Sequence, residues 1–293
     1  MQSEKRADPL KLLKRLIFTM LVSALSSASS QETWAADFHS PRTTGLGGAG
    51  RAGPLLNDAI HLNPSFATFL KERVSAGFNY LAHGSSPDDR TYQVSLQDGR
   101  SPFFEAGISY TRLFSGSMIH FGASRSFIQR TGFGIGAKFI RPDDRGALLS
   151  DFSLSATGIL TPEIQAALVV DNLIQSDFAR ANGYFREIAL GTKINIMKMI
   201  LIYIDPHYTP ELPAGSSSKL GYAAGAELVL FQDVFLRAGT YRNSKQPIFN
   251  TRGDGWGLGA GWLGPKISFD FGYNQTLSDF PSTLWSLGAT LYL

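Results

Sequence analysis

The chain of 293 residues contains no cysteine. This absence excludes disulfide bonds, thiolate metal sites and a lipid-modified N-terminal cysteine. Charged residues are also scarce, at 17% against about 25% in ordinary soluble domains. The net charge of +3 is too small and too scattered to indicate nucleic-acid binding, and no metal-ligand spacing occurs. The composition therefore predicts a protein without a cofactor, a metal or a nucleic-acid partner, and with an unusually uncharged surface.

Long apolar runs are missing as well. After residue 30 no stretch approaches the roughly 18 apolar residues that a membrane-spanning helix needs, and the mean hydropathy is only −0.04. Before that point, basic residues precede the apolar stretch 16–28, which is the order found in a secretory signal peptide. Cleavage after Ala28 or Ala35 fits the small-residue rule, so we assign residues 1–36 to a signal peptide. An uncleaved anchor helix is the weaker alternative, because the apolar part is short.

Glycine and aromatic residues are abundant, and they alternate. From Gly255 to Tyr273, apolar residues such as Trp256 and Trp262 occupy every second position, and Gly, Ser, Asp and Asn occupy the others. A period of two predicts strands, and these two faces are typical of strands that meet lipid on one side and a polar lumen on the other. Similar rows recur to the C-terminus and give about fourteen strands of about ten residues. The longest loops are predicted at residues 206–218 and 242–254, which are polar. We therefore predict an all-β transmembrane antiparallel up-and-down β-barrel over residues 72–293.

The segment before the predicted barrel is different. It contains a glycine cluster, then an Asn-Asp-Ala step, then an Asn-Pro pair. No Lys-Ser or Lys-Thr follows the glycines, so a phosphate-binding loop is not indicated. A close-packed backbone, which only glycine permits, is the simpler explanation. The residues singled out here are Gly45, Gly47, Gly48, Gly50, Asn57, Asp58, Asn63 and Pro64.

These motifs resemble the mature N-termini of the FadL and PorV/PorQ superfamily of outer-membrane barrels. The resemblance implies an address in a bacterial outer membrane and fourteen strands. It also implies that residues 37–71 form a plug, or hatch, inside the barrel. Two positions depart from the family pattern, because Ser65 stands where alanine is usual and Leu293 stands where phenylalanine is common.

The resemblance implies two different functions. Similarity to FadL implies passive transport of hydrophobic small molecules, with flexible hatch glycines and with Asn57, Asp58 and Asn63 anchoring the hatch to the wall. Similarity to PorV and PorQ implies a barrel that binds a secreted or surface protein during secretion or surface attachment. A closed structural barrel is a third possibility. The expected partners are outer-membrane lipid and either a hydrophobic ligand or such a protein.

Charged residues on the polar rows should point inward, because Lys or Arg on the lipid face at midplane costs about 2–4 kcal/mol. Such a wall either closes the lumen through ion pairs or borders a ligand route. Arg112, Arg125 and Arg237 fall on rows that otherwise look outward, where they would reach the head groups unless a bulge turns them inward. No serine-centred or acid-paired motif surrounds the inward histidine, so no catalytic residue and no enzyme are predicted. The predicted polar wall is Glu105, His120, Lys138, Asp171, Glu187, Lys193, Glu227 and Asp270.

Overall fold

The structure is a computed structural model, and the described residues all belong to one compact unit, Trp34–Leu293. The predicted signal peptide, residues 1–36, lies outside the described residues and stays a prediction. No helix in the described ranges is long and apolar enough to cross a membrane. The described ranges are 39–55, 57–70, 74–84, 90–101, 103–113, 116–143, 148–181, 184–212, 218–245, 252–277 and 281–293.

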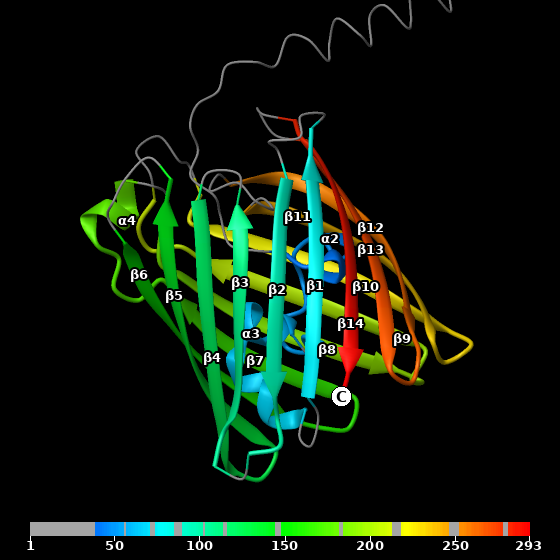
Figure 1. Cartoon of the computed structure of the whole chain (residues 1–293). Coiled ribbons are helices and arrows are strands. Elements are labelled where there is room, and N and C mark those ends of the chain that lie inside the picture. Colours follow the sequence, from blue (N-terminus) through cyan, green and yellow to red (C-terminus); the bar gives the residue numbers. More distant parts are fainter. Residues whose placement is uncertain are drawn as a thin grey trace, which may run out of the picture. The chain divides into compact units, whose positions relative to one another are not determined.

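Fourteen antiparallel strands form one closed barrel, as predicted (Figure 1). Each strand pairs with its neighbours in sequence, and the first strand closes the ring against the last, with Phe78 opposite Ala289. Closure leaves no unpaired strand edge. The strands are β1 (Val74–His83), β2 (Arg90–Asp98), β3 (Glu105–Leu113), β4 (Gly116–Ile128), β5 (Thr131–Pro142), β6 (Leu149–Ile159), β7 (Ile164–Asp171), β8 (Glu187–Ile196), β9 (Ile200–Tyr208), β10 (Leu220–Leu230), β11 (Val234–Lys245), β12 (Arg252–Leu263), β13 (Ile267–Thr276) and β14 (Thr283–Tyr292).

The two ends of the barrel differ in their connections. At the end that carries the C-terminus, short turns such as 197–199 and 231–233 join the strands, and we call it the turn end (Figure 1). At the other end, the loop end, most of the connections are longer. One of them, between β7 and β8, contains the short helix α4 (Asp177–Ala181), which the sequence did not predict. In bacterial barrels the short turns face the periplasm and the long loops face outward.

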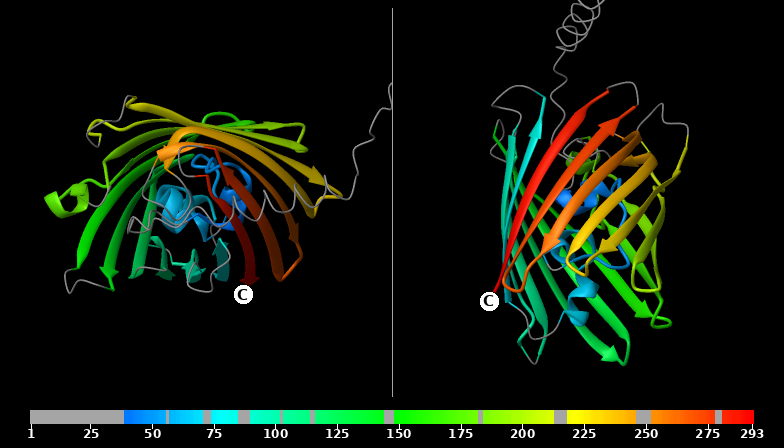
Figure 2. Two further views of the ribbon diagram at one scale, coloured as in Figure 1. Left: turned by 90° about the horizontal axis from the view of Figure 1, so that it is seen from above. Right: turned by 90° about the vertical axis from the view of Figure 1, so that its right-hand side faces the viewer.

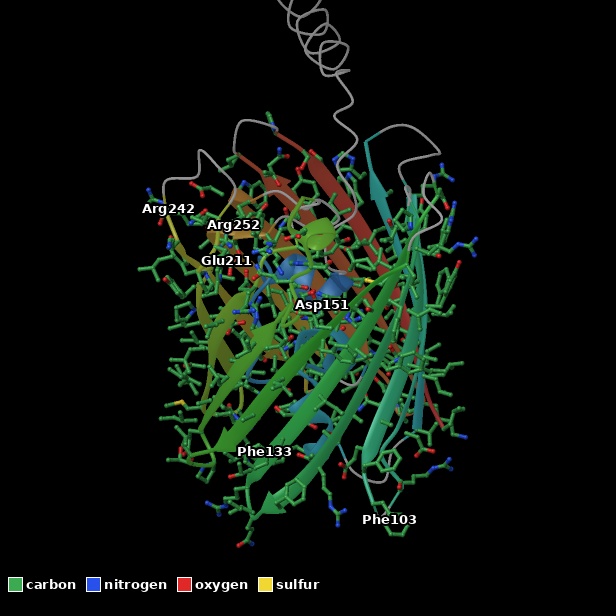
Figure 3. All side chains as sticks on the ribbon, turned by 90° about the vertical axis from the view of Figure 1, so that its left-hand side faces the viewer. Phe103, Phe133, Asp151, Glu211, Arg242 and Arg252 are labelled. Carbon is green, nitrogen blue, oxygen red and sulfur yellow. The ribbon has the colours of Figure 1, made fainter. Side chains whose placement is uncertain are left out.

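The two faces of the wall have opposite chemistry. On β2, for example, Tyr92, Val94 and Leu96 are exposed on the outside, whereas Gln93 and Ser95 are buried on the inside. Apolar side chains cover the outer face of the barrel (Figure 3). Soluble monomers rarely expose apolar patches larger than a few hundred Å², so this belt is typical of a surface that faces lipid.

Two local predictions were wrong. The strand β9 continues through Pro206 to Tyr208, where the sequence predicted a loop from residue 206 onward. Pro206 is exposed on the outer face. Because side chains alternate along a strand, its neighbours Asp205 and His207 point inward. Arg237, predicted to lie on an outward row, is buried on the inside at 4% exposure.

Residues 39–70, which we call the inner segment, lie inside the barrel (Figure 2). The helix α2 (Pro41–Gly45) packs against β11–β14. The helix α3 (Asp58–Leu62) and the 3₁₀ helix η1 (Pro64–Phe69) pack against strands of the arc β3–β6. Helices of five or six residues are not stable alone, so their contacts with the wall hold them in place. The boundaries of the predicted hatch and its movement remain predictions.

Candidate functional site in the barrel interior

Glycines of the wall make room for the inner segment. A methyl group at Gly239 would overlap the carbonyl group of Leu46, and one at Gly134 would overlap the amide of Ser65. Neighbouring strands place such glycines side by side, so the wall is flat where the segment rests on it. The sequence analysis assigned these glycines only to a polar lumen face. The two rows are Gly225, Gly239 and Gly257 on β10–β12, and Gly107, Gly122 and Gly136 on β3–β5.

The glycines predicted for the hatch lie at tightly packed positions. A methyl group at Gly45 would stand 2.9 Å from the Cα of Gly259 on the wall. Gly47, Gly48 and Gly50 have φ angles of 63°, 83° and 127°, a backbone region that favours glycine. Every residue from 41 to 50 is buried. Backbone geometry therefore explains why these positions are glycine. The role of these glycines as flexible hinges remains a prediction.

Asn57 ties the start of α3 to the wall. Its Nδ2 donates to Ser95 Oγ at 2.6 Å, and its Oδ1 accepts from Ser75 Oγ at 2.5 Å. Asp58 follows it, and lines a cavity on the same side together with Arg42 and other residues. The predicted anchor at Asn57 is therefore a side-chain contact with β1 and β2.

Asn63 and Ser65 form a second anchor, on β6, and Pro64 between them lies against glycines of β4 and β5. The Nδ2 of fully buried Asn63 donates to Thr157 Oγ1 at 2.7 Å, and the Ser65 amide donates to Ser155 Oγ at 2.9 Å. The Ser65 hydroxyl also lies 2.7 Å from Thr157 Oγ1. Ser65 therefore adds a polar contact that alanine, the usual residue in the family pattern, cannot make.

A first charge cluster joins α2 to the wall. Arg42 Nη2 donates to Tyr203 Oη at 2.7 Å, and its Nε lies 3.4 Å from Glu227 Oε2. Arg237 holds the same carboxylate at 2.6 Å and Asp270 at 2.5 Å. The side chains of Arg42, Glu227 and Arg237 are at most 3% exposed. Buried ions are tolerated only when each is paired, and here two guanidinium groups and two carboxylates balance.

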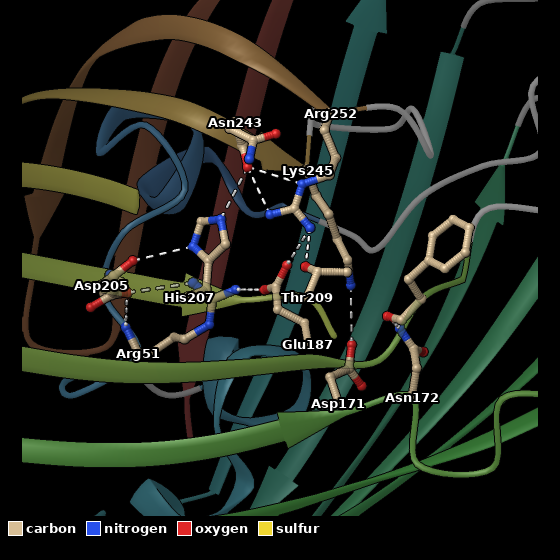
Figure 4. Close-up of polar contacts among 12 residues, drawn as sticks. Arg51, Asp171, Asn172, Glu187, Asp205, His207, Thr209, Asn243, Lys245 and Arg252 are labelled. Carbon is tan, nitrogen blue, oxygen red and sulfur yellow. Dashed lines mark hydrogen bonds and ion pairs between the residues drawn. The ribbon is translucent and has the colours of Figure 1, made fainter. Parts of the chain in front are cut away.

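A second charge cluster lies nearer the loop end and holds the chain around Arg51 (Figure 4). The amides of Gly50 and Arg51 donate to Asp205 Oδ2 at 2.8 and 2.9 Å. The Arg51 guanidinium pairs with Glu187 Oε1 at 2.8 Å, and Arg252 lies 3.8 Å from the same carboxylate. One carboxylate from β8 and one from β9 therefore bind both the backbone and the side chain of the inner segment.

Wall residues extend this cluster. Asp171 accepts from Lys138 Nζ at 3.0 Å and pairs with Lys245 at 3.5 Å. His207 Nε2 and the Arg252 guanidinium both approach the Asn243 carbonyl, at 3.3 and 2.7 Å (Figure 4). The strand ends at this side of the barrel are thus cross-linked by ion pairs.

All eight residues of the predicted polar wall lie on the inward face. Lys193 lies against Gly53 of the inner segment, and Glu105 lies opposite Ser124 on the neighbouring strand. His120 Nδ1 is 3.1 Å from His61 Nδ1 of α3, and His61 Nε2 is 2.8 Å from Gln93 Nε2. The remaining five belong to the two charge clusters described above.

Several residues of these clusters were missed. Arg42 and Arg51 belong to the inner segment, whose charges the sequence analysis did not consider. Asp205 and His207 follow Tyr203 at a period of two, and this spacing was the signal that the proline obscured. Arg252 was placed in a loop, but it begins β12.

An apolar cluster lies inside the barrel at the loop end, and we call it the apolar collar. Its strand members stand where their strands meet the loops, and α4 and Tyr184 pack against them. The two charge clusters lie deeper in the lumen, so the chemistry of the lumen changes towards the loop end. The apolar collar consists of Leu81, Leu113, Met118, Ile140, Leu149, Ala179, Tyr184 and Leu284.

Two small cavities lie in the interior of the barrel. One cavity of about 50 Å³ is bordered by Arg51, His61 and Glu187, and one of about 40 Å³ is bordered by Arg42 and Asp58. Cavities of this size hold about one to a few water molecules. In this conformation, the two interior cavities described here are too small for a fatty acid.

No protein-family model and no curated protein matches the chain. Solved structures do match it. A FadL homologue from Pseudomonas aeruginosa superposes with a TM-score of 0.62 at 12% identity, over 88% of this chain and 99% of that one. The toluene transporter TodX from Pseudomonas putida gives 0.62 at 10% identity, over 89% and 99%. The chain has the FadL-type barrel fold.

At identities this low, the FadL-type fold is shared without evident sequence similarity. A TodX mutant described as a monoaromatic hydrocarbon channel also matches, with a TM-score of 0.58 at 10% identity over 87% of this chain and 98% of that one. The predicted resemblance to FadL is therefore confirmed as a likeness of fold, and the predicted resemblance to PorV and PorQ stays a prediction.

Proposed function

We propose that this FadL-type barrel lies in a bacterial outer membrane and passively transports hydrophobic small molecules, with the inner segment as its gate. The apolar collar carries this proposal, because a permanently closed polar lumen would need no apolar lining at its mouth. Solved structures with this fold include proteins described as toluene transporters. We assign no catalytic role to the residues of the interior.

A ligand entering from the loop end would meet the collar first. Beyond the collar, the two small cavities leave no room for it, so the inner segment has to move. Movement must break a defined set of contacts, which includes Asn57 with Ser95, Asn63 with Thr157, and Arg51 with Glu187. All three are polar contacts, which water can replace once the segment leaves the wall.

A reversible disulfide lock between the inner segment and the wall tests this gate. Because the chain has no native cysteine, two introduced cysteines can pair only with each other. The Asn57 and Ser95 side chains touch at 2.6 Å, so the double variant Asn57→Cys, Ser95→Cys should form a disulfide between the inner segment and β2. We expect the oxidised variant to lose uptake of radiolabelled oleate by cells that carry the protein. Reduction should restore uptake.

The matched control is Ser95→Cys, Ser109→Cys, which joins two positions that already face each other on β2 and β3. This bridge leaves the inner segment free, so uptake should not depend on the redox state. Unchanged uptake of oleate by the oxidised Asn57→Cys, Ser95→Cys variant would contradict the gating proposal.

A second function, binding of a secreted or surface protein, is favoured by the loop end. Arg180 of α4 pairs with Glu211 of the β9–β10 loop at 3.2 Å, so two loops form one exposed surface. Within α4, Arg180 also pairs with Asp177 at 2.5 Å. A stoichiometric protein that co-purifies with the barrel, and stays bound when the lock is oxidised, would support this function over transport.

A further inference from the structure

The outer face of the wall contains a hollow over β4–β7. Its volume is about 560 Å³. Ala123 and Ala156 form its floor, and the register places Ile135 beside Ala123, and Phe133 and Leu168 on either side of Ala156. The hollow therefore arises because small side chains alternate with large ones along one outward row. Figure 3 shows Phe133 on this face of the barrel, towards the turn end.

A single basic residue stands at the turn end of this hollow. Arg125 is exposed, and its Cζ lies 5.6 Å from the centre of the Phe127 ring. Both residues are near the end of β4, where the pairing with β5 shifts register between Ser126 and Ile128. The guanidinium group is therefore held beside apolar surface at the edge of the outer belt.

The charge of Arg125 has no counterion in the part of the chain that the structure describes. Among the described residues it makes no ion pair. Arg112, another outward arginine, is different, because it pairs with Asp143 at 2.7 Å. Hydrogen bonds from Arg112 hold the pKa of that loop carboxyl below its usual range. An unpaired arginine on a lipid-facing wall is stabilised when its guanidinium reaches an anion at the head-group level.

An apolar hollow that ends at an unpaired cation fits an amphipathic anion. We propose that this hollow binds one anionic glycerophospholipid of the periplasmic leaflet, with an acyl chain over Ala123 and Ala156 and the phosphate on Arg125. The inference rests on the membrane placement proposed above, because the turn end then faces the periplasm. Guanidinium groups bind phosphate through paired hydrogen bonds, which lysine or a neutral side chain cannot reproduce.

The wall contains a second hollow that serves as an internal comparison. It lies over β1 and β12–β14, has a volume of about 650 Å³, and has Ala260 and Ala289 on its floor. Phe78 and Trp262 border it, and no basic residue is among the residues that line it. It can contact acyl chains as the first hollow does, but it offers nothing to a phosphate.

Native mass spectrometry of the detergent-extracted protein, titrated with phosphatidylglycerol, tests the proposal. The wild type should retain one tightly bound phosphatidylglycerol. Arg125→Gln should weaken its binding about fivefold, the effect of one basic residue at a membrane surface. Ala156→Leu, which fills the hollow, should remove the bound lipid. Ala289→Leu, which fills the second hollow, and Arg112→Gln should leave its binding unchanged.

Two results would overturn the lipid site. One is wild-type affinity in both Arg125→Gln and Ala156→Leu, and the other is equal binding of diacylglycerol, which lacks a phosphate. Insertion of each variant into vesicles, followed by the shift in electrophoretic mobility on heating, checks that the barrel has folded. Failure of the wild type to insert would contradict the membrane placement itself. Insertion without selective lipid binding would contradict the lipid site alone.

Discussion

Replacing Gly239 with alanine tests whether close backbone packing holds the inner segment in place. The added methyl group would overlap the carbonyl group of Leu46, which is completely buried. The register puts Gly225 and Gly257 on either side of Gly239. The wall at this point therefore has no flexible side chain that could move to make room for the methyl group. We expect the inner segment around Leu46 to leave the wall.

The size of the effect follows from a matched substitution. At Gly158 the nearest heavy atom to an added methyl group is Leu160 Cδ2, at 3.8 Å, which is ordinary contact. Alanine lowers backbone entropy in the unfolded chain at both positions, worth about 0.5–1 kcal/mol. The overlap exists only at Gly239 and costs about 1–3 kcal/mol. The two variants should therefore differ by about 2 kcal/mol, or about 30-fold in the equilibrium for local opening.

Hydrogen exchange followed by mass spectrometry measures this opening. The amides of Leu46 and Gly48 donate to the carbonyls of Arg42 and Thr43 in the closed segment, so they exchange only when it opens. They should exchange about 30-fold faster in Gly239→Ala than in Gly158→Ala. Equal exchange in the two variants would refute the argument that the glycine row exists to accommodate the segment.

Two further predictions concern the polar interior. Arg237→Met should lower the free energy of unfolding by about 3 kcal/mol, because Glu227 loses its nearer partner in a buried site. The side chain of Arg242 is 72% exposed, so Arg242→Met should change the free energy of unfolding by less than about 0.5 kcal/mol. Unfolding in micelles with guanidinium chloride measures both variants. His120→Ala should lower the protection of the α3 amides against hydrogen exchange, because the contact of 3.1 Å between His120 Nδ1 and His61 Nδ1 is lost. Unchanged protection in this variant would contradict this role of the pair.

The fold could be predicted because residues alternate along each strand between the apolar outer face and the polar inner face of the wall. Along β12, Trp256, Leu258 and Trp262 alternate with glycines, and a helix could not place such residues on separate faces. Turn chemistry was less informative. Met197 and Lys198, like Phe231 and Gln232, adopt positive φ without asparagine or glycine, so these turns follow from strand pairing rather than from local preference.

The site was only partly predictable, because its contacts join residues far apart in the chain. Arg42 and Glu227 are 185 positions apart, and no local pattern pairs them. The inward row of β11 contains Gly239 and Tyr241, and its outward row contains Ala238 and Thr240. Neither row is clearly more apolar, so the direction of Arg237 could not be read from alternation.

The closed ring has a consequence for the order of assembly. The inner segment precedes β1 in the chain, and it contacts both the arc β3–β6 and the arc β11–β14. Once β1 has paired with β14, folding the segment inward would mean passing it through an end of a finished cylinder. We therefore expect the segment to rest among the early strands before the last strands pair. The closing of the wall and the filling of its interior would then be one event, in which a segment made before the strands is the template around which the last strands are placed.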